Sequence, residues 1–201
     1  MTTPTLKELK PLSPAAFFEV KGKLSKWEKN RPFEEGRLSD LSFLSGGQKT
    51  LDLSLMWSPF ALHLELRARR PLESGDLFEL LIDTRDLKSS NVITRFCHHF
   101  LYDFDEEEGR EVTRFRGEDQ HPLADPSLLK IQRDLKRHHF QAHLLIPKEL
   151  LFGYDPAQFN RLGFCYKFKG KRGEKESFHL SPDHFNLDKH PALWASMEMI
   201  S

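Results

Sequence analysis

Residues 50–57 read Thr-Leu-Asp-Leu-Ser-Leu-Met-Trp, and residues 61–69 read Ala-Leu-His-Leu-Glu-Leu-Arg-Ala-Arg. In both stretches an apolar side chain recurs at every second position, first at Leu51, Leu53, Leu55 and Trp57 and then at Leu62, Leu64, Leu66 and Ala68. A period of two places one face of a strand against a core and the other face in water, as in antiparallel sheets. The break between the two stretches contains Pro59, which has no N–H for a strand ladder, and it predicts a hairpin connection.

Strand-like patterns continue along the rest of the chain. Residues 77–82 are apolar on both faces except at Glu79, which predicts a central strand. Alternating runs recur at residues 92–104, 129–146, 162–168 and 194–200, with shorter strands predicted at 112–115 and 178–180. Pro147 is expected to end one of these strands, and residues 148–152 to form a single helical turn.

The number and spacing of these runs define the fold class. They amount to about ten short strands separated by turn signals, with no amphipathic helix of normal length. The pattern predicts an all-β protein, an antiparallel β-sandwich of the jelly-roll or immunoglobulin-like kind. A chain of 201 residues suits one domain, placed here at residues 15–201. Residues 1–14 contain three prolines and are predicted to form a flexible tail.

The composition limits the classes of partner. Lys plus Arg equals Asp plus Glu at 30 each, so the net charge is zero and neither nucleic acid nor membrane is expected as a partner. The start of the sequence shows no secretory signal, so the default location is cytoplasmic, with export by a signal-independent route left open. Cys97 and Cys165 lie in apolar runs and are predicted to be buried free thiols; a bridge between two strands is the alternative.

The stretch Asp76-Leu-Phe-Glu79-Leu-Leu-Ile-Asp83 carries a D-x-x-E-x-x-x-D pattern. It resembles the central strand of the family-nine carbohydrate-binding modules and their DOMON-like relatives. Further segments resemble that family in the same order: a hairpin at 57–65, Gly-Tyr-Asp-Pro at 153–156, Leu-Gly-Phe-Cys-Tyr at 162–166 and Pro-Ala-Leu-Trp at 191–194. The resemblance covers most of residues 17–200. It implies two antiparallel sheets, often with bound calcium, in which one face or one end of the sandwich receives a sugar.

The acidic residues at the end of the predicted central strand are candidate metal ligands. Asp83 and Asp86, with loop carbonyls, would give a hard cation such as calcium its oxygen ligands. The alternative is that both carboxylates end the strand and pair with Arg85 or Arg95. The spacing of the ten histidines suggests no zinc site, because His139 and His143 are about 13 Å apart on a strand.

Two adjacent histidines make residues 95–100 unusual. His98 shares a strand face with Phe96 and Phe100 and is expected to be partly buried, whereas His99 faces the other way with Cys97. An imidazole there can serve as a metal ligand, a general base or a sugar contact. The alternative is a core histidine satisfied by a neighbouring group, and an acid from residues 76–86 would be a natural partner.

The candidate ligand-binding residues are Trp27, Arg95, His98, His99 and Tyr102. Trp27 lies between Lys26 and Glu28 and is the tryptophan best placed to be exposed for stacking on a ring.

Three functions compete. The first is a non-catalytic binding module for a glycan or another polar small molecule, and the second is a protein-interaction or scaffold domain that has lost sugar binding. The third, ranked last, is an enzyme that uses His98 or His99 with Asp83 or Glu79 as acid and base, since no catalytic motif is present.

Overall fold

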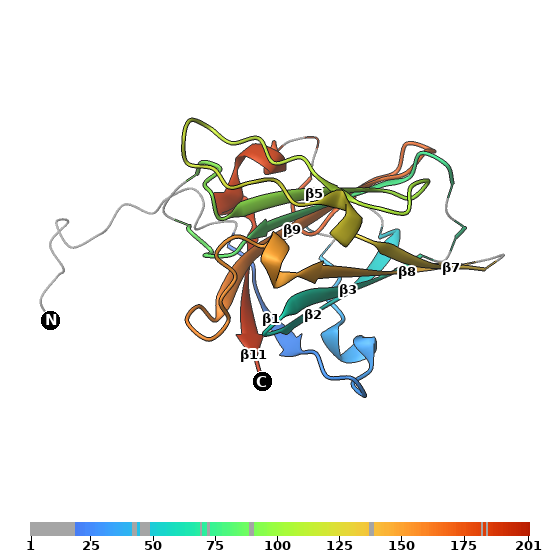
Figure 1. Ribbon diagram of the computed structural model, residues 1–201. Coiled ribbons are helices and arrows are strands. Elements are labelled where there is room, and N and C mark those ends of the chain that lie inside the picture. Colours follow the sequence, from blue (N-terminus) through green and yellow to red (C-terminus); the bar gives the residue numbers. More distant parts are fainter. Residues whose placement is uncertain are drawn as a thin grey trace, which may run out of the picture.

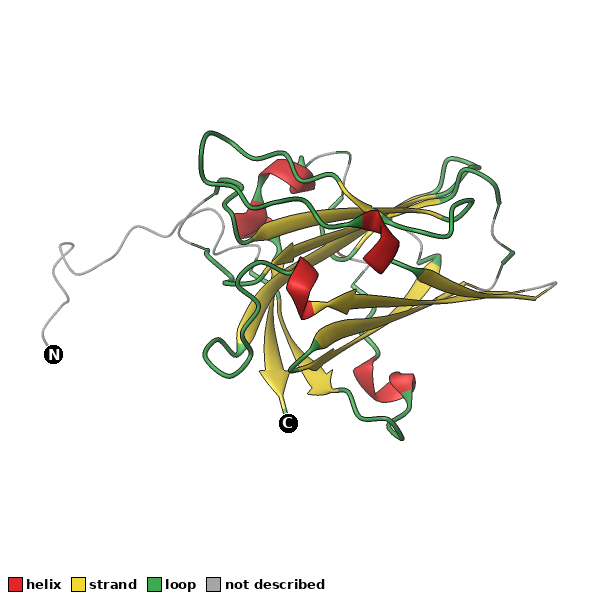
Figure 2. Cartoon of the chain, viewed as in Figure 1, coloured by secondary structure: helices red, strands yellow, loops and turns green. Residues whose placement is uncertain are grey.

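The computed structural model describes residues 19–41, 44, 49–68, 70–71, 73–88, 91–136, 139–181, 183 and 185–201, without the side chains at 135 and 136. The predicted tail at residues 1–14 lies outside this part of the chain. Within it the regular structure consists of eleven strands and single 3-10 turns (Figure 2). None of the helices described there has the length and apolar character needed to cross a membrane.

The strands occur throughout the described chain. They are β1 (Lys21–Lys26), β2 (Leu51–Ser58), β3 (Ala61–Ala68), β4 (Leu77–Asp83), β5 (Cys97–Asp103), β6 (Arg110–Glu111), β7 (Ile131–Lys136), β8 (His139–Pro147), β9 (Arg161–Lys169), β10 (Lys175–Ser177) and β11 (Ala195–Ile200). The 3-10 turns are η3 (Phe33–Gly36), η5 (Pro126–Leu128), η6 (Lys148–Leu150), η7 (Leu187–Lys189) and η8 (Pro191–Leu193).

One continuous sheet curls into two layers. Its strand order is β6-β5-β4-β9-β11-β1-β2-β3-β8-β7, with β10 paired to β9. Figure 1 shows β5 and β9 in one layer, β3, β8 and β7 in the other, and β11 and β1 where the sheet turns from one layer to the other. The all-β, layered prediction is confirmed, but the strictly antiparallel one is wrong. Strand β1 runs parallel to both β11 and β2, so the sheet is mixed.

The alternating runs form strands where the apolar pattern is strong. Strands β2 and β3 pair from Leu51↔Ala68 to Ser58↔Ala61, which confirms the hairpin. Strand β4 lies between β5 and β9 and is buried on both faces, as expected for the central strand. The turn after Pro147 is η6. Cys97 and Cys165 are buried free thiols, as predicted.

Several boundaries differ from the predictions. Strand β5 begins at Cys97 instead of residue 92, because the chain turns there and the Cys97 N–H donates to the Thr94 carbonyl. The strand predicted at 112–115 is confined to residues 110–111, and that predicted at 178–180 ends at Ser177. Strand β1 was not predicted, since Leu24 is its one buried apolar side chain.

The core lies between the two layers as a single cluster. In β4 the side chains of Phe78, Leu80 and Ile82 point inward, and the odd-numbered positions point to the outer face of the sheet. Phe104, directly after β5, meets Phe140 of β8 edge-on, with ring centroids 5.0 Å apart. This alternation brings two neighbouring histidines of β5 to opposite faces.

Candidate functional site

A charged group occupies the outer face of the β4–β5–β9 layer. Glu79 of β4 is paired in register with Lys167 of β9, and His99 of β5 lies diagonally across the β4–β5 pair. The Glu79 Oε2 atom is 2.7 Å from His99 Nε2 and 2.7 Å from Lys167 Nζ. Burial by itself would raise the pKa of Glu79, but hydrogen bonds from His99 and Lys167 outweigh it and lower the pKa to about 2. Glu79 is therefore an ionised acceptor.

A cavity of about 530 Å³ opens beside this group; we call it the His99 cavity. Its lining consists of Glu79, Ile93, His99, Val112, Arg114, Phe115, Arg116, Asp188 and Lys189. The segment after β6 forms one wall, because the Val112 N–H donates to the His99 carbonyl and the His99 N–H donates to the Thr113 hydroxyl. Among the described residues, the guanidinium groups of Arg114 and Arg116 are exposed and have no acidic partner. The cavity thus presents ionised groups and the half-buried ring of Phe115.

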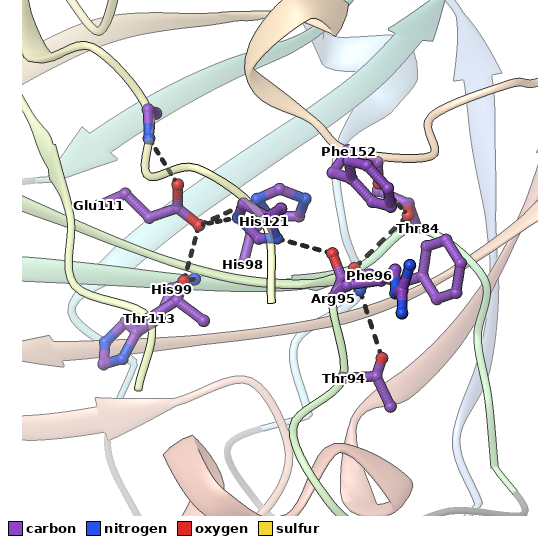
Figure 3. Close-up of polar contacts among 11 residues, drawn as sticks. Thr84, Thr94, Arg95, Phe96, His98, His99, Glu111, Thr113, His121 and Phe152 are labelled. Atoms are coloured by element: carbon purple, nitrogen blue, oxygen red, sulfur yellow. Dashed lines mark hydrogen bonds and ion pairs between the residues drawn. The ribbon is translucent and has the colours of Figure 1, made fainter. Parts of the chain in front are cut away.

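A second group lies on the inner face of the same layer. His98 of β5, Glu111 of β6 and His121 of the following loop converge there, with side chains 0%, 0% and 2% exposed (Figure 3). Glu111 Oε1 is 3.0 Å from His98 Nδ1 and 2.9 Å from His121 Nε2. The Thr113 hydroxyl donates to the same oxygen at 2.7 Å, and the Ala124 N–H donates to Oε2 at 2.8 Å. Glu111 therefore connects residues 113–124 to β5.

The electrostatics of this buried group follow from its contacts. Burial would raise the pKa of Glu111, but hydrogen bonds from His121 and His98 outweigh it and hold the pKa at about 2. Burial lowers the pKa of His98, with Glu111 acting in the opposite direction. His121 Nδ1 is 2.6 Å from the Arg95 carbonyl. Both of its ring nitrogens thus face acceptors, so hydrogen bonds at both require an N–H at each.

Solved structures share this two-layered arrangement. A family 9 carbohydrate-binding module from Caldicellulosiruptor kristjanssonii, in complex with cellotriose, superposes with a TM-score of 0.60 over 89% of this chain and 93% of that chain, at 12% identity. The same kind of module in complex with glucose gives 0.59 over 90% and 96%, again at 12% identity. The fold is that of a family 9 module. No protein-family model matches the sequence, and no curated protein matches it.

The family 9 fold confirms the resemblance read from the sequence, and its strands separate the predicted ligand-binding residues. His99 lines the His99 cavity, whereas His98 lies behind it in the core. Tyr102 is fully buried, and Arg95 forms an ion pair with Asp119.

Trp27 belongs to a different part of the surface. Its ring stacks on His63, with centroids 4.2 Å apart and planes at 6°. Both residues line a second cavity of about 490 Å³, the Trp27 cavity, with Phe33, Ser127, Leu128, Lys130, Gln132, His143, Leu144 and Leu145. The five predicted residues therefore do not form one site.

The acids predicted as metal ligands make the contacts of a strand end. Asp83 accepts hydrogen bonds from the N–H groups of Arg85 at 2.9 Å and Leu87 at 2.7 Å. Asp86, at a φ of 49°, is 3.0 Å from Lys88 Nζ and accepts a hydrogen bond from the Ser196 hydroxyl. Of the two arginines named in the alternative, Arg95 pairs with Asp119, and Arg85 contacts Asp83 through its backbone N–H. The calcium site at Asp83 and Asp86 stays a prediction.

The expected partner of His98 was also wrong. We expected an acid from residues 76–86, but His98 binds Glu111, and it is His99 that binds Glu79 from that strand. Of the acid–base pairs considered for an enzyme, the structure brings together only Glu79 and His99. Glu111, His121 and Lys167 were not singled out from the sequence. Only strand pairing and loop folding bring them to these positions, and no spacing signals that.

Proposed function

We propose that this protein is a non-catalytic carbohydrate-binding module and that the sugar binds in the His99 cavity. The observation that carries this proposal is an ionised carboxylate, Glu79, fixed by His99 and Lys167 beside a cavity of about 530 Å³. Small-molecule sites are typically of this size and orient their ligands with a few well-placed polar groups. The family 9 fold supports the sugar-binding part of this proposal, because solved modules with that fold hold cellotriose or glucose.

The chemistry of the cavity suits a polyol. Sugar hydroxyls both donate and accept hydrogen bonds, and those made to charged groups are about twice as strong as neutral ones. Glu79 accepts, while the exposed guanidinium groups of Arg114 and Arg116 donate. The half-buried ring of Phe115 supplies an apolar surface for the C–H face of a sugar.

The Trp27 cavity is the alternative location for the same function. Its stacked Trp27 and His63 rings form an aromatic surface, but its residues include no acid. We therefore favour the His99 cavity, where charged acceptors and donors meet.

The experiment has two stages. An affinity gel and glycan array with plant, bacterial and host glycans, neutral and acidic, identifies a retained sugar, and calorimetry then measures its dissociation constant. Glu79→Gln is expected to weaken binding by about 10-fold or more, because one charged hydrogen bond contributes about 1.5–3 kcal/mol. Trp27→Ala is the matched control and is expected to stay within about 2-fold.

Each outcome decides a part of the proposal. Loss of binding with Trp27→Ala but not with Glu79→Gln would move the site to the Trp27 cavity. Absence of retardation on every glycan would reject the sugar-binding function and favour a protein-interaction domain.

A further inference from the structure

We propose that His98, Glu111 and His121 form a binding site for one Zn²⁺ ion inside the protein. One ring nitrogen of His98, one of His121 and a Glu111 carboxylate oxygen all lie within 4.8 Å of one another. Among the described residues this is the one cluster of three or more His, Cys, Asp or Glu side chains that close. The site is distinct from the His99 cavity, because His98 and His99 point to opposite faces of β5.

The distances from the two ring nitrogens to the carboxylate fit a metal ion with little movement. Zinc binds imidazole nitrogen and carboxylate oxygen at about 2 Å, so tetrahedral ligands lie about 3.3 Å apart. The two nitrogens are now 3.0 and 2.9 Å from Glu111 Oε1, so each contact needs to open by only a few tenths of an ångström. Ion binding displaces the two N–H protons that now point at the carboxylate: the proton on His121 Nε2 leaves to solvent, and the proton on His98 Nδ1 moves to Nε2 of the same ring.

The groups around the three residues are those that orient metal ligands. A metal-bound histidine usually donates its other N–H to a carbonyl or carboxylate, and ligating carboxylates are themselves hydrogen-bonded. His121 Nδ1 already faces the Arg95 carbonyl at 2.6 Å. Glu111 already accepts from the Thr113 hydroxyl and the Ala124 N–H. All of these hydrogen bonds remain when Nε2 of His121 and the carboxylate bind the ion.

His98 supplies a second, independent observation. Its Nε2 atom is fully buried and has no hydrogen-bond partner. The bond to Glu111 requires the ring proton to be on Nδ1. Nε2 then carries a buried lone pair with no donor, and burying an unsatisfied acceptor costs free energy. Coordination through Nδ1 transfers the ring proton to Nε2. The Phe152 carbonyl, which lies beside this ring, can then accept a hydrogen bond from Nε2–H, in addition to the one it accepts from the Thr84 hydroxyl. The metal-bound form thus resolves the buried unpaired nitrogen.

The donor set and the burial select the metal. Two imidazoles and one carboxylate suit zinc, whereas calcium takes six to eight oxygen ligands. The same three donors also hold iron in oxygenases. Here all three side chains are 2% exposed or less. The surroundings are aromatic: His98 stacks near Phe100 at 5.6 Å, and His121 meets Phe115 edge-on at 4.7 Å.

Metal binding is measured directly, without reference to any sugar. The full chain is stripped with a chelator, loaded with zinc and desalted, and zinc per chain is measured by plasma mass spectrometry. We expect one equivalent for the wild type and none for His98→Gln/His121→Gln. The matched control His139→Gln/His143→Gln, which changes two histidines outside the core, should keep one equivalent. Equal zinc in the wild type and the His98→Gln/His121→Gln variant, or loss in the control, would overturn the proposal.

A measurement on the wild type alone covers the case in which the core variant does not fold. In ¹H–¹⁵N spectra of the histidine side chains, zinc should shift His98 Nδ1 and His121 Nε2 and leave His63 and His143 unchanged. Calcium should shift none of them. Shifts confined to the other histidines, or no shift at all, would reject the site. Because neither measurement contains sugar, its failure would not bear on carbohydrate binding.

Discussion

Glu79 and His99 lie diagonally across the β4–β5 pair, with Glu79 Oε2 2.7 Å from His99 Nε2. Lys167 on β9 reaches the same oxygen from the other side at 2.7 Å. One carboxylate oxygen therefore receives donors from both neighbouring strands, which keeps it ionised and pointing at the His99 cavity.

Removing the lysine should raise the pKa of Glu79. Lys167→Met deletes one hydrogen bond and one positive charge that favour the carboxylate, so its pKa should rise from about 2 toward 4.5. Carbon-detected NMR titration of the side-chain carboxyl group measures this directly. The control Lys169→Met changes an exposed lysine on the same strand and should leave the pKa of Glu79 unchanged. An unchanged Glu79 titration in Lys167→Met would contradict the assigned contact.

Breaking the buried Asp76–Arg70 ion pair should strongly destabilise the fold. Asp76 is 0% exposed and accepts two hydrogen bonds from Arg70 and one each from the Glu73 and Lys171 N–H groups. Asp76→Ala leaves a partly buried guanidinium and two N–H groups without that acceptor, so the free energy of unfolding should fall by about 3–5 kcal/mol. Urea unfolding followed by fluorescence measures the loss.

An exposed ion pair serves as the control for the buried Asp76–Arg70 pair. Arg172, whose side chain is 69% exposed, pairs with Glu73 at the same end of the sheet. Arg172→Ala should leave the free energy of unfolding nearly unchanged, because solvent screens such exposed pairs. Equal losses for Asp76→Ala and Arg172→Ala would show that burial does not set the strength of these contacts.

Mild acid should destabilise the protein through His179. This residue is 1% exposed, and burial lowers its pKa from 6.5 to about 4, despite a hydrogen bond to the Leu193 carbonyl. As the pH falls, the unfolded state takes up a proton on this ring at a higher pH than the folded state, which keeps the ring neutral. The contribution of His179 to the free energy of unfolding is therefore complete above pH 6.5. It is lost as the pH drops toward 4, by roughly 2–3 kcal/mol.

The test compares the wild type with His179→Gln, which keeps an N–H donor for Leu193. Denaturant unfolding at several pH values between 7 and 4, with chelator present so that metal binding does not contribute, should show a flatter pH dependence in the variant. Parallel curves for the two proteins would rule out His179 as a source of the acid sensitivity.

The two thiols should be unreactive until the protein unfolds. Burial is the main cause that raises the pKa of Cys97 to about 11 and that of Cys165 to about 12, so neither forms a thiolate at neutral pH. A chromogenic disulfide reagent should detect no thiol in the folded protein and both after denaturation. Fast reaction of either thiol before unfolding would contradict its burial.

Much of the sheet was predictable, because alternation is a local property of the chain. The period of two identified β2 and β3 and placed His98 and His99 on opposite faces of β5, and the apolar run at residues 77–82 identified β4. Strand β1 was missed because backbone pairing with β11 and β2 holds its polar sequence in the sheet. The same parallel pairs make the sheet mixed, and no local pattern reports which distant strands become neighbours.

The sequence by itself determined an all-β fold, its main strands and the facing of each strand residue, since side-chain direction follows from position along a strand. Only the tertiary structure decided which side chains meet. Glu79 acquires Lys167 from a strand about ninety residues away, and Glu111 acquires His121 from an irregular loop. Such contacts depend on strand order and loop path. These are set by burial of the whole core and not by the spacing of the residues that the core brings together.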